Sequence, residues 1–271
     1  MQPDSRPDFP VSVPAIVVFE VAALFARSAL ETSLIRDGSE PRLAQHLSYL
    51  VVPPILLVLL CPYLARCKDS LRSLLRPADW TARVVLCSIL LGLTLRITYW
   101  AVLTVLMWLG LVGTRDPKAI VGPLIGFDCP SPPVLLLSFA VMAVLTPVTE
   151  EVINRGFFLH ALMPRGTTLA LLLSAALFAV MHDPGSYPAT FAIGLLLGTQ
   201  MLNYRTLWAP ILTHATYNAA AIVDWDCFRF VWNPPASDPG LAVAAGLAAP
   251  LALAGIVAAL FLASEKAARA P

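Results

Sequence analysis

Charged residues are scarce in this chain of 271 residues. Asp, Glu, Lys and Arg make up 13% of the sequence and hydrophobic residues 58%, and the mean hydropathy is +0.76. Soluble globular domains carry about 25% charged residues. The shortage of charge excludes an ordinary soluble domain, and we predict an integral membrane protein.

Long basic blocks are also missing. The 18 Lys and Arg residues are balanced by 17 Asp and Glu residues, which gives a formal net charge of +1. We therefore expect no nucleic-acid partner. Residues 1–10 contain neither a basic region nor a small-residue cleavage site. We expect the first hydrophobic segment to remain in the mature protein as a membrane span.

In place of charge the chain has long hydrophobic runs. A helix of about 20 apolar residues crosses the hydrocarbon core of a bilayer. No internal repeat and no low-complexity tail is visible, so we treat the chain as one membrane domain. We predict an all-α, polytopic bundle of about eight spans in the lipid bilayer: 11–27, 47–65, 84–112, 134–162, 167–183, 187–204, 207–224 and 241–263.

The segment 66–83, between spans two and three, is the most basic stretch of the chain. The positive-inside rule places it in the cytoplasm, and eight spans then place both termini there. Because arginine outnumbers lysine 15 to 3, as in proteins from GC-rich bacteria, we expect a bacterial plasma membrane. The segment is either a solvated basic loop or a surface helix that turns three leucines and Trp80 toward lipid.

Two adjacent carboxylates, Glu150 and Glu151, follow the uncharged run 134–148. A carboxylate at the centre of a bilayer costs about 2.5–3.5 kcal/mol and usually marks a functional site. Arg155 follows Glu151 by four residues, so the two side chains can pair along one helix. Pro147 either frees a backbone carbonyl and kinks span four beside the glutamates or is an ordinary proline of a membrane helix.

Two further polar motifs occur in spans five and seven. Phe178 precedes His182 by four residues, and His214 precedes Asn218 by four. Each pair lies on one helix face, and polar groups in a membrane bundle face inward. The residue types suit hydrolysis. A carboxylate can take a proton from water, an imidazole can orient that water, and an imidazole with an amide can stabilise an oxyanion.

Each residue also has a purely structural interpretation. Glu151 and Arg155 could form a buried ion pair that fixes helix register. A single intramembrane histidine is commonly a hydrogen-bonded packing residue. Asn218 could join two helices, and Phe178 could simply pack beneath His182. The combination of all three motifs favours a hydrolytic site over these separate interpretations.

The three motifs together resemble a known family. EExxxR at 150–155, FxxxH at 178–182 and HxxxN at 214–218 are similar in type and order to the motifs of the CAAX protease and bacteriocin-processing family of intramembrane proteases. That family includes the type II prenyl-protein endopeptidases. The resemblance covers residues 134–224, which we take as the protease core. Residues 1–133 then form an N-terminal part with three spans, and residues 225–271 form an outer loop, the last span and a tail.

The resemblance implies an intramembrane endopeptidase that cuts a membrane-anchored protein or peptide near its anchor, without a covalent intermediate. Glu150 would activate water with help from His182, and an oxyanion hole would complete the site. The implied catalytic residues are Glu150, His182, His214 and Asn218, and the implied site-shaping residues are Glu151, Arg155 and Phe178. Two other functions remain open: a non-catalytic membrane immunity or assembly factor with the same fold, and a transporter that uses the intramembrane acid.

The family has been described both with and without a metal. Glu150, His182 and His214 could supply three zinc ligands and leave one open position. However, the chain has no HExxH pair, and Glu151 would be the only base left. We favour a mechanism without a cofactor and keep zinc as the alternative.

Five cysteines are present, and none forms a CxxC motif. Cys129 and Cys227 fall in two separate predicted outer loops. If the outer side is oxidising, the two could form a disulfide.

Overall fold

The computed structural model describes most of the chain between residues 12 and 223, namely residues 12–39, 41–59, 61–66, 68–76, 80–109, 125–127, 131–182 and 184–223, together with residues 228–230, 243, 246–248 and 255. The fold is all-α, as predicted. Among the described residues the only strands form one short two-stranded ladder.

The chain divides into two compact units, each built from two stretches of sequence. Unit 1 comprises Met1–Leu86 and Val144–Leu212, and unit 2 comprises Cys87–Ala143 and Thr213–Pro271. The boundaries fall within three helices, because α5 (Ala82–Trp108), η2 (Phe139–Leu145) and α11 (Trp208–Ile222) each contribute residues to both units. The sequence-based division at residues 133 and 224 stays a prediction.

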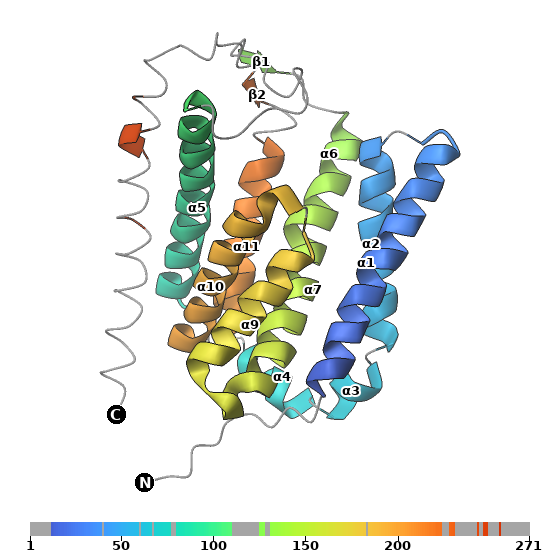
Figure 1. Ribbon diagram of the computed structural model, residues 1–271, viewed down its shortest axis with the longest axis vertical. Helices are drawn as coiled ribbons and strands as arrows, with labels where there is room; N and C mark the ends of the chain where they lie inside the picture. The colour runs from blue at the N-terminus through green and yellow to red at the C-terminus, as the bar shows by residue number, and fades with distance from the viewer. Residues whose placement is uncertain are drawn as a thin grey trace. The chain divides into compact units, whose positions relative to one another are not determined.

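Unit 1 contains the two helix pairs that surround the glutamates. Helix α1 packs against α2, and α9 packs against α10 (Figure 1). The elements in chain order are α1 (Val13–Arg36), α2 (Pro41–Leu59), α3 (Cys61–Arg66), α4 (Lys68–Leu74), α7 (Thr146–Glu151), the π-helix η3 (Val152–Leu159), α8 (His160–Leu162), the 3-10 helix η4 (Met163–Arg165), α9 (Thr167–Val180), the 3-10 helix η5 (Pro184–Ser186) and α10 (Tyr187–Tyr204).

Unit 2 contains most of the remaining helices and the ladder. Strands β1 and β2 are antiparallel, with Gly126 opposite Arg229. Aromatic residues favour strands, and β2 reads Phe-Arg-Phe. Cys129 and Cys227, the predicted disulfide partners, lie outside the described residues. The elements are α5 (Ala82–Trp108), β1 (Ile125–Phe127), α6 (Pro132–Ser138), the π-helix η2 (Phe139–Leu145), α11 (Trp208–Ile222) and β2 (Phe228–Phe230).

Three described helices are long and apolar enough to cross a membrane: Val13–Arg36, Ala82–Val102 and Pro132–Arg165. The chain is therefore an integral membrane protein by the length and composition of its helices. The first helix continues nine residues beyond the predicted span, because hydropathy falls at Arg27 but the helix ends only before Gly38, which has φ +90°. The count of eight spans stays a prediction, and most of segment 241–263 lies outside the described residues.

The helix that carries the glutamates contains two π-helical segments. Residues 139–145 and 152–159 are π-helical and flank the short α-helix α7. Pro147 lies in the first turn of α7, and a proline there lacks the N–H for a regular i to i−4 bond. A π-helical segment next to a proline is one way in which a helix accommodates the missing hydrogen bond. Such segments occur frequently at functional sites.

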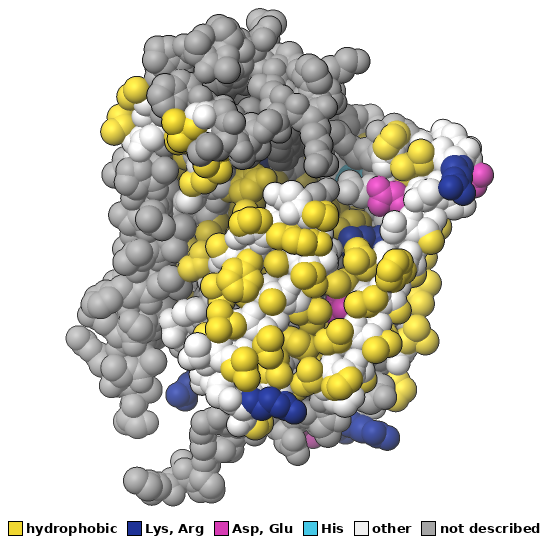
Figure 2. Space-filling view, viewed as in Figure 1, with side chains coloured by type: hydrophobic (Ala, Val, Ile, Leu, Met, Phe, Trp, Pro, Cys, Tyr) yellow, Lys and Arg dark blue, Asp and Glu magenta, His cyan; other side chains and the backbone are white. Residues whose placement is uncertain are grey.

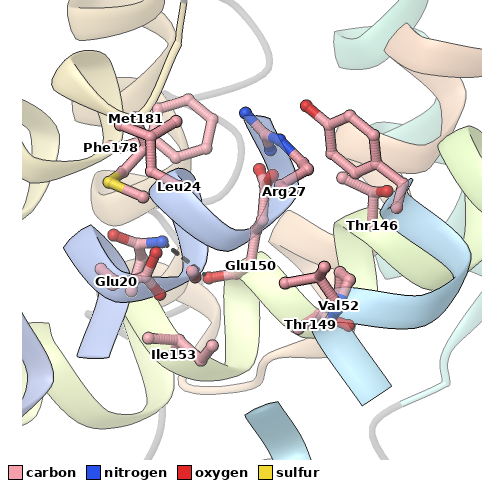
Figure 3. Close-up of a pocket in the computed structure, with 14 residues that line it drawn as sticks. Glu20, Leu24, Arg27, Val52, Thr146, Thr149, Glu150, Ile153, Phe178 and Met181 are labelled. Atoms are coloured by element: carbon pink, nitrogen blue, oxygen red, sulfur yellow. Dashed lines mark hydrogen bonds between the residues drawn. The ribbon is translucent and has the colours of Figure 1, made fainter. Parts of the chain in front are cut away.

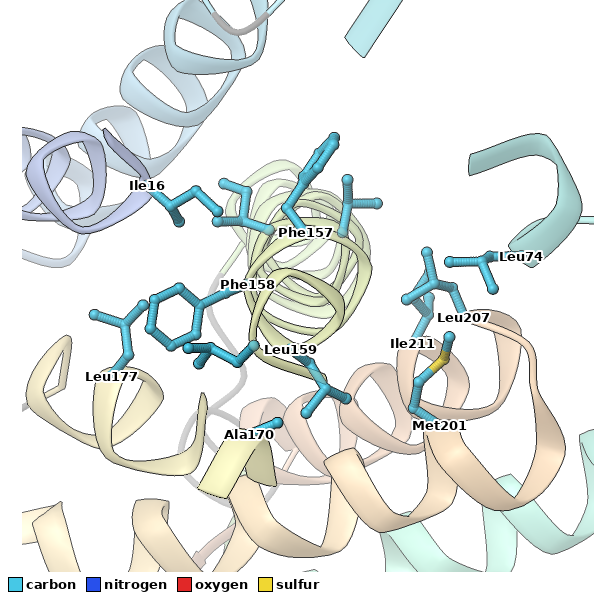
Figure 4. Close-up of a cluster of buried hydrophobic side chains, with 13 residues drawn as sticks. Ile16, Leu74, Phe157, Phe158, Leu159, Ala170, Leu177, Met201, Leu207 and Ile211 are labelled. Carbon is cyan, nitrogen blue, oxygen red and sulfur yellow. The ribbon is translucent and has the colours of Figure 1, made fainter. Parts of the chain in front are cut away.

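The hydrophobic core of unit 1 is centred on η3. Phe157, Phe158 and Leu159 point outward in three directions and meet side chains from α1, α4, α9, α10 and α11 (Figure 4). All three are less than 5% exposed. The buried core therefore holds η3 in place from several sides, and with it the adjoining helix α7.

Small residues allow α9 and α10 to approach closely. Gly194 and Gly198 lie four residues apart on α10, a small-xxx-small pattern that is typical of membrane helix pairs. A Cβ atom on Gly194 would lie 3.0 Å from the Cα of Ala175 on α9. The main chains are therefore too close for a side chain at this position.

The basic segment after span two contains a helix, α4, but its leucines do not face lipid. Leu74 is buried, and its carbonyl oxygen accepts hydrogen bonds from the Leu207 N–H (2.8 Å) and the Thr206 hydroxyl (3.0 Å). Trp80 packs on Trp208 with ring centroids 4.9 Å apart. The lipid-facing interpretation is wrong for Leu74, because the turn between α10 and α11 binds the end of α4.

Much of the surface is hydrophobic, as lipid contact requires. Figure 2 shows hydrophobic side chains over the described part of one face, with Lys and Arg side chains along its lower edge. On α1, Val18 and Phe25 are 68% and 70% exposed. Because the two residues are seven positions apart, about two helical turns, they lie on the same face of α1, which is its outer face.

Candidate functional site

Glu151 and Arg155 form an ion pair that is closed to solvent. Arg155 Nη1 lies 3.0 Å from Glu151 Oε1, and both side chains are 0% exposed. Arg155 Nη2 donates to the carbonyl oxygen of Gly194 on α10 (3.1 Å), and the guanidinium carbon lies 4.5 Å from the Phe178 ring centroid. The pair that the four-residue spacing predicts is present, and it joins η3 to α9 and α10.

Glu150 is in a different environment from its neighbour. Its side chain lines a cavity of about 50 Å³ enclosed by α1, α2, α7, η3 and α9. Figure 3 shows Glu150 in the middle of the group, with Glu20 and Arg27 entering from α1. Among the described residues, the buried atom Oε2 of Glu150 has no hydrogen-bond partner. The two adjacent glutamates therefore have different surroundings: Glu151 is paired with an arginine, and Glu150 is directed to a cavity.

Three more polar residues of the same helix line this cavity: Thr146, Thr149 and Asn154. Thr146 and Asn154 lie four residues before and after Glu150, and both line the cavity. Asn154 Nδ2 donates to the main-chain carbonyl of Glu150 at 3.0 Å, which the dashed line in Figure 3 marks. Thr146, Asn154 and Arg27 are not among the site residues predicted from the sequence. The spacing of Thr146, Glu150 and Asn154 at intervals of four was the available signal.

Side chains also satisfy the carbonyl groups of the π-helical segment. The Ser174 hydroxyl donates to the carbonyl of Asn154 (3.1 Å), and His160 Nδ1 contacts the carbonyl of Arg155 (2.7 Å). Because a change from α- to π-winding alters which N–H reaches which carbonyl, such contacts stabilise η3. They fix the helix at the residues that carry the site.

His182 follows the end of α9 and has a defined orientation. Its Nδ1 lies 2.7 Å from the carbonyl oxygen of Phe178, and the two rings are 4.6 Å apart at 52°. A carbonyl oxygen only accepts, so Nδ1 carries the proton in this contact, and in the neutral ring Nε2 is the acceptor. Phe178 packs against His182, as its spacing predicts. Phe178 lines the cavity, whereas His182 is not among the cavity-lining residues.

His214 and Asn218 belong to the second unit. His214 is buried. Asn218 Nδ2 donates to the carbonyl oxygen of Met142 at 2.8 Å, within the same unit. This bond fixes the amide and uses one of its two N–H groups.

Residues 132–220 match the family model for type II CAAX prenyl endopeptidase Rce1-like proteins. The matched segment contains all seven predicted catalytic and site-shaping residues. The resemblance seen in the three motifs is thereby confirmed, and the Rce1-like family is a protease family. No curated protein and no solved structure matches the chain.

A metal would need a compact set of donors. In the part of the chain that the structure describes, no group of three His, Cys, Asp or Glu residues is arranged to hold a metal ion. Glu151, the only base that a zinc-bound Glu150 would leave, is already paired with Arg155. The zinc alternative therefore stays a prediction, for which the described residues show no set of three donors.

Proposed function

We propose that this protein is an intramembrane endopeptidase of the Rce1-like type, in which Glu150 activates the attacking water. The observation that carries the proposal is the contrast within the acid pair. Glu151 Oε1 is paired with Arg155 and does not line the cavity, while Glu150 directs an oxygen that has no hydrogen-bond partner among the described residues to a cavity large enough for water. Together with the family match over residues 132–220, this contrast favours Glu150 as the base.

The proposed reaction is a direct hydrolysis. Glu150 takes a proton from water, the water oxygen attacks the scissile carbonyl, and the C–N bond breaks as the proton passes to the leaving amine. His182 assists through Nε2, which its Nδ1 contact with Phe178 leaves as an acceptor. No serine or cysteine nucleophile takes part.

The remaining residues have supporting roles in the proposal. Glu151 and Arg155 hold η3 against α9 and α10, which supports the position of the adjacent Glu150. His214 and Asn218 would stabilise the oxyanion, and removal of such a donor typically lowers the rate by about 10²–10³. The bond from Asn218 to Met142 fixes the amide and leaves one N–H for this purpose.

The proposed substrate is a peptide bond close to a membrane anchor. A prenylated CAAX sequence is the substrate type that the family description names. If the protein is bacterial, a bacteriocin leader or a C-terminal sorting segment of a surface protein fits the same chemistry. All three place the scissile bond near the bilayer, where the apolar surface of this protein lies.

The test uses purified full-length protein in lipid nanodiscs with an internally quenched, farnesylated peptide that ends in a CAAX sequence. Mass spectrometry of the products in H₂¹⁸O should show one new carboxyl terminus that carries one ¹⁸O atom. A parallel comparison of protein termini in cells with wild-type and Glu150→Gln protein tests the non-prenylated substrates. An unchanged cellular phenotype and unchanged termini in the Glu150→Gln strain would favour an immunity or assembly factor that acts by binding.

A further inference from the structure

Three buried oxygen atoms on one helix face lack hydrogen-bond partners among the described residues. They are Thr146 Oγ1, Glu150 Oε2 and Asn154 Oδ1. The three residues are spaced by four, and all three line the single cavity described above. Thr146 and Asn154 are 4% and 2% exposed. Buried polar atoms in folded proteins are satisfied by protein or by ordered water, so this concentration of open positions in one cavity needs a ligand.

The identity of the Asn154 oxygen is fixed by its neighbour. The carbonyl of Glu150 only accepts, so the amide nitrogen must face it, as the 3.0 Å contact requires. The amide oxygen then faces away from that carbonyl. A carboxylate oxygen and an amide oxygen are both acceptors, and the Thr146 hydroxyl can donate or accept. The site therefore calls for a small ligand that donates hydrogen bonds.

Water meets these requirements. A cavity needs about 10–15 Å³ to hold one water, and a buried water usually makes two to four hydrogen bonds. The cavity volume of about 50 Å³ therefore holds a small cluster rather than a single molecule. Polar groups, among them Glu150 and Asn154, lie in its lining and distinguish it from purely apolar cavities, which stay dry.

We propose that Thr146 and Asn154 are water-positioning residues, which together with Glu150 hold an ordered water cluster that supplies the nucleophile. Water at Glu150 donates one hydrogen to Oε2, the atom that accepts the proton in the reaction. Asn154 Oδ1 and Thr146 Oγ1 form hydrogen bonds with the other positions of the water cluster. These bonds keep a lone pair of the attacking water oxygen directed to the substrate. The inference rests on the proposed peptidase function and adds two residues to it.

The kinetic test compares Thr146→Val and Asn154→Leu with wild type on the farnesylated CAAX peptide. Thr146→Val replaces the hydroxyl by a methyl group, and Asn154→Leu replaces the amide oxygen and nitrogen by methyl groups, each at an unchanged number of heavy atoms. We expect kcat to fall at least tenfold for each, with KM unchanged, because the substrate does not contact these groups. Thr199→Val on α10 is the matched control. Its hydroxyl is bonded to the Leu195 carbonyl (2.8 Å) away from the cavity, and its kcat should equal that of wild type.

The variants could also affect folding, so melting temperature and gel-filtration profile are measured for each. Asn154→Leu loses the contact with the Glu150 carbonyl, whereas Thr146→Val keeps the shape of the side chain. A reduced kcat in a well-folded Thr146→Val protein therefore supports water positioning. If both variants cleave like wild type while Glu150→Gln is inactive, the peptidase function stands and the water-positioning inference is overturned.

A second readout does not depend on activity. An experimental structure at a resolution that shows ordered water should contain water within hydrogen-bond distance of Glu150 Oε2 and Asn154 Oδ1, with at least one of these waters missing in Asn154→Leu. A dry cavity in the wild-type protein overturns the inference even if peptide cleavage is observed. Ordered water in a protein that cleaves no peptide would contradict the peptidase function and leave only the hydration site.

Discussion

Glu151 and Arg155 contact each other at 3.0 Å in a position where neither side chain is exposed. Removing one partner of a buried ion pair leaves the other charge uncompensated and typically costs about 3–5 kcal/mol. We therefore predict that Arg155→Met lowers the free energy of unfolding by about this amount. The double variant Glu151→Gln/Arg155→Met should be more stable than Arg155→Met alone.

The measurement is denaturant unfolding of the purified variants in one detergent. Arg165→Met is the control, because Arg165 is exposed and its Nη1 donates to the nearby Ala161 carbonyl (3.3 Å). Strictly additive effects of the Glu151 and Arg155 changes would contradict a coupled pair.

The glycines of α10 give a second prediction about packing. A Cβ on Gly194 would meet main-chain Cα of Ala175 at 3.0 Å, while a Cβ on Gly198 would meet the flexible end of Leu171 at 2.8 Å. Overpacking costs about 1–3 kcal/mol, and alanine regains up to about 1 kcal/mol of helix propensity. Gly194→Ala should therefore be destabilised and Gly198→Ala nearly neutral.

Because Gly194 also accepts the Arg155 hydrogen bond, its replacement should reduce peptide cleavage as well as thermal stability. Thermal unfolding and kcat are measured on the same preparations. Equal melting temperatures for the two alanine variants would show that the α9–α10 contact is less constrained than the geometry indicates.

The contact between His182 Nδ1 and the Phe178 carbonyl predicts the behaviour of two His182 variants. Asparagine can keep a donor near the Nδ1 position but offers nothing at Nε2. If Nε2 assists proton transfer, kcat should fall by about 10²–10⁴ in both His182→Asn and His182→Ala. The asparagine variant should be the more stable of the two. Near wild-type kcat in His182→Asn would restrict His182 to a structural role.

A chelator experiment separates the metal-free and zinc mechanisms. With Glu151 held by Arg155, a zinc-bound Glu150 would leave no base for the attacking water. We predict that peptide cleavage survives dialysis against 1,10-phenanthroline and that added Zn²⁺ does not raise kcat. Loss of activity on dialysis, with recovery on Zn²⁺ addition, would favour the zinc alternative.

Local spacing was enough to predict several features of the site. The pairing of Glu151 with Arg155 and the packing of Phe178 on His182 follow from positions four apart on a helix. Composition was enough to predict an all-α membrane protein. These features depend on one helix or on average hydropathy, which a sequence displays directly.

Other features depend on contacts between distant segments. The binding of Leu74 by residues at the turn after α10 reverses the expected lipid-facing side of α4. Arg27 contributes to the cavity because of the way α1 packs. In the sequence, Asn154 is distinguished only by its spacing of four residues from Glu150. The π-helical segments also alter which side chains share a face, so a regular 3.6-residue period does not predict them.

The most direct measurement of the central claim is kcat of Glu150→Gln on the farnesylated CAAX peptide. The change keeps the size of the side chain and removes its negative charge and its ability to take a proton. Glu31→Gln makes the same change on α1, outside the cavity lining. We predict no detectable cleavage by Glu150→Gln at unchanged melting temperature, and wild-type cleavage by Glu31→Gln. Cleavage by Glu150→Gln at the wild-type rate would contradict Glu150 as the base.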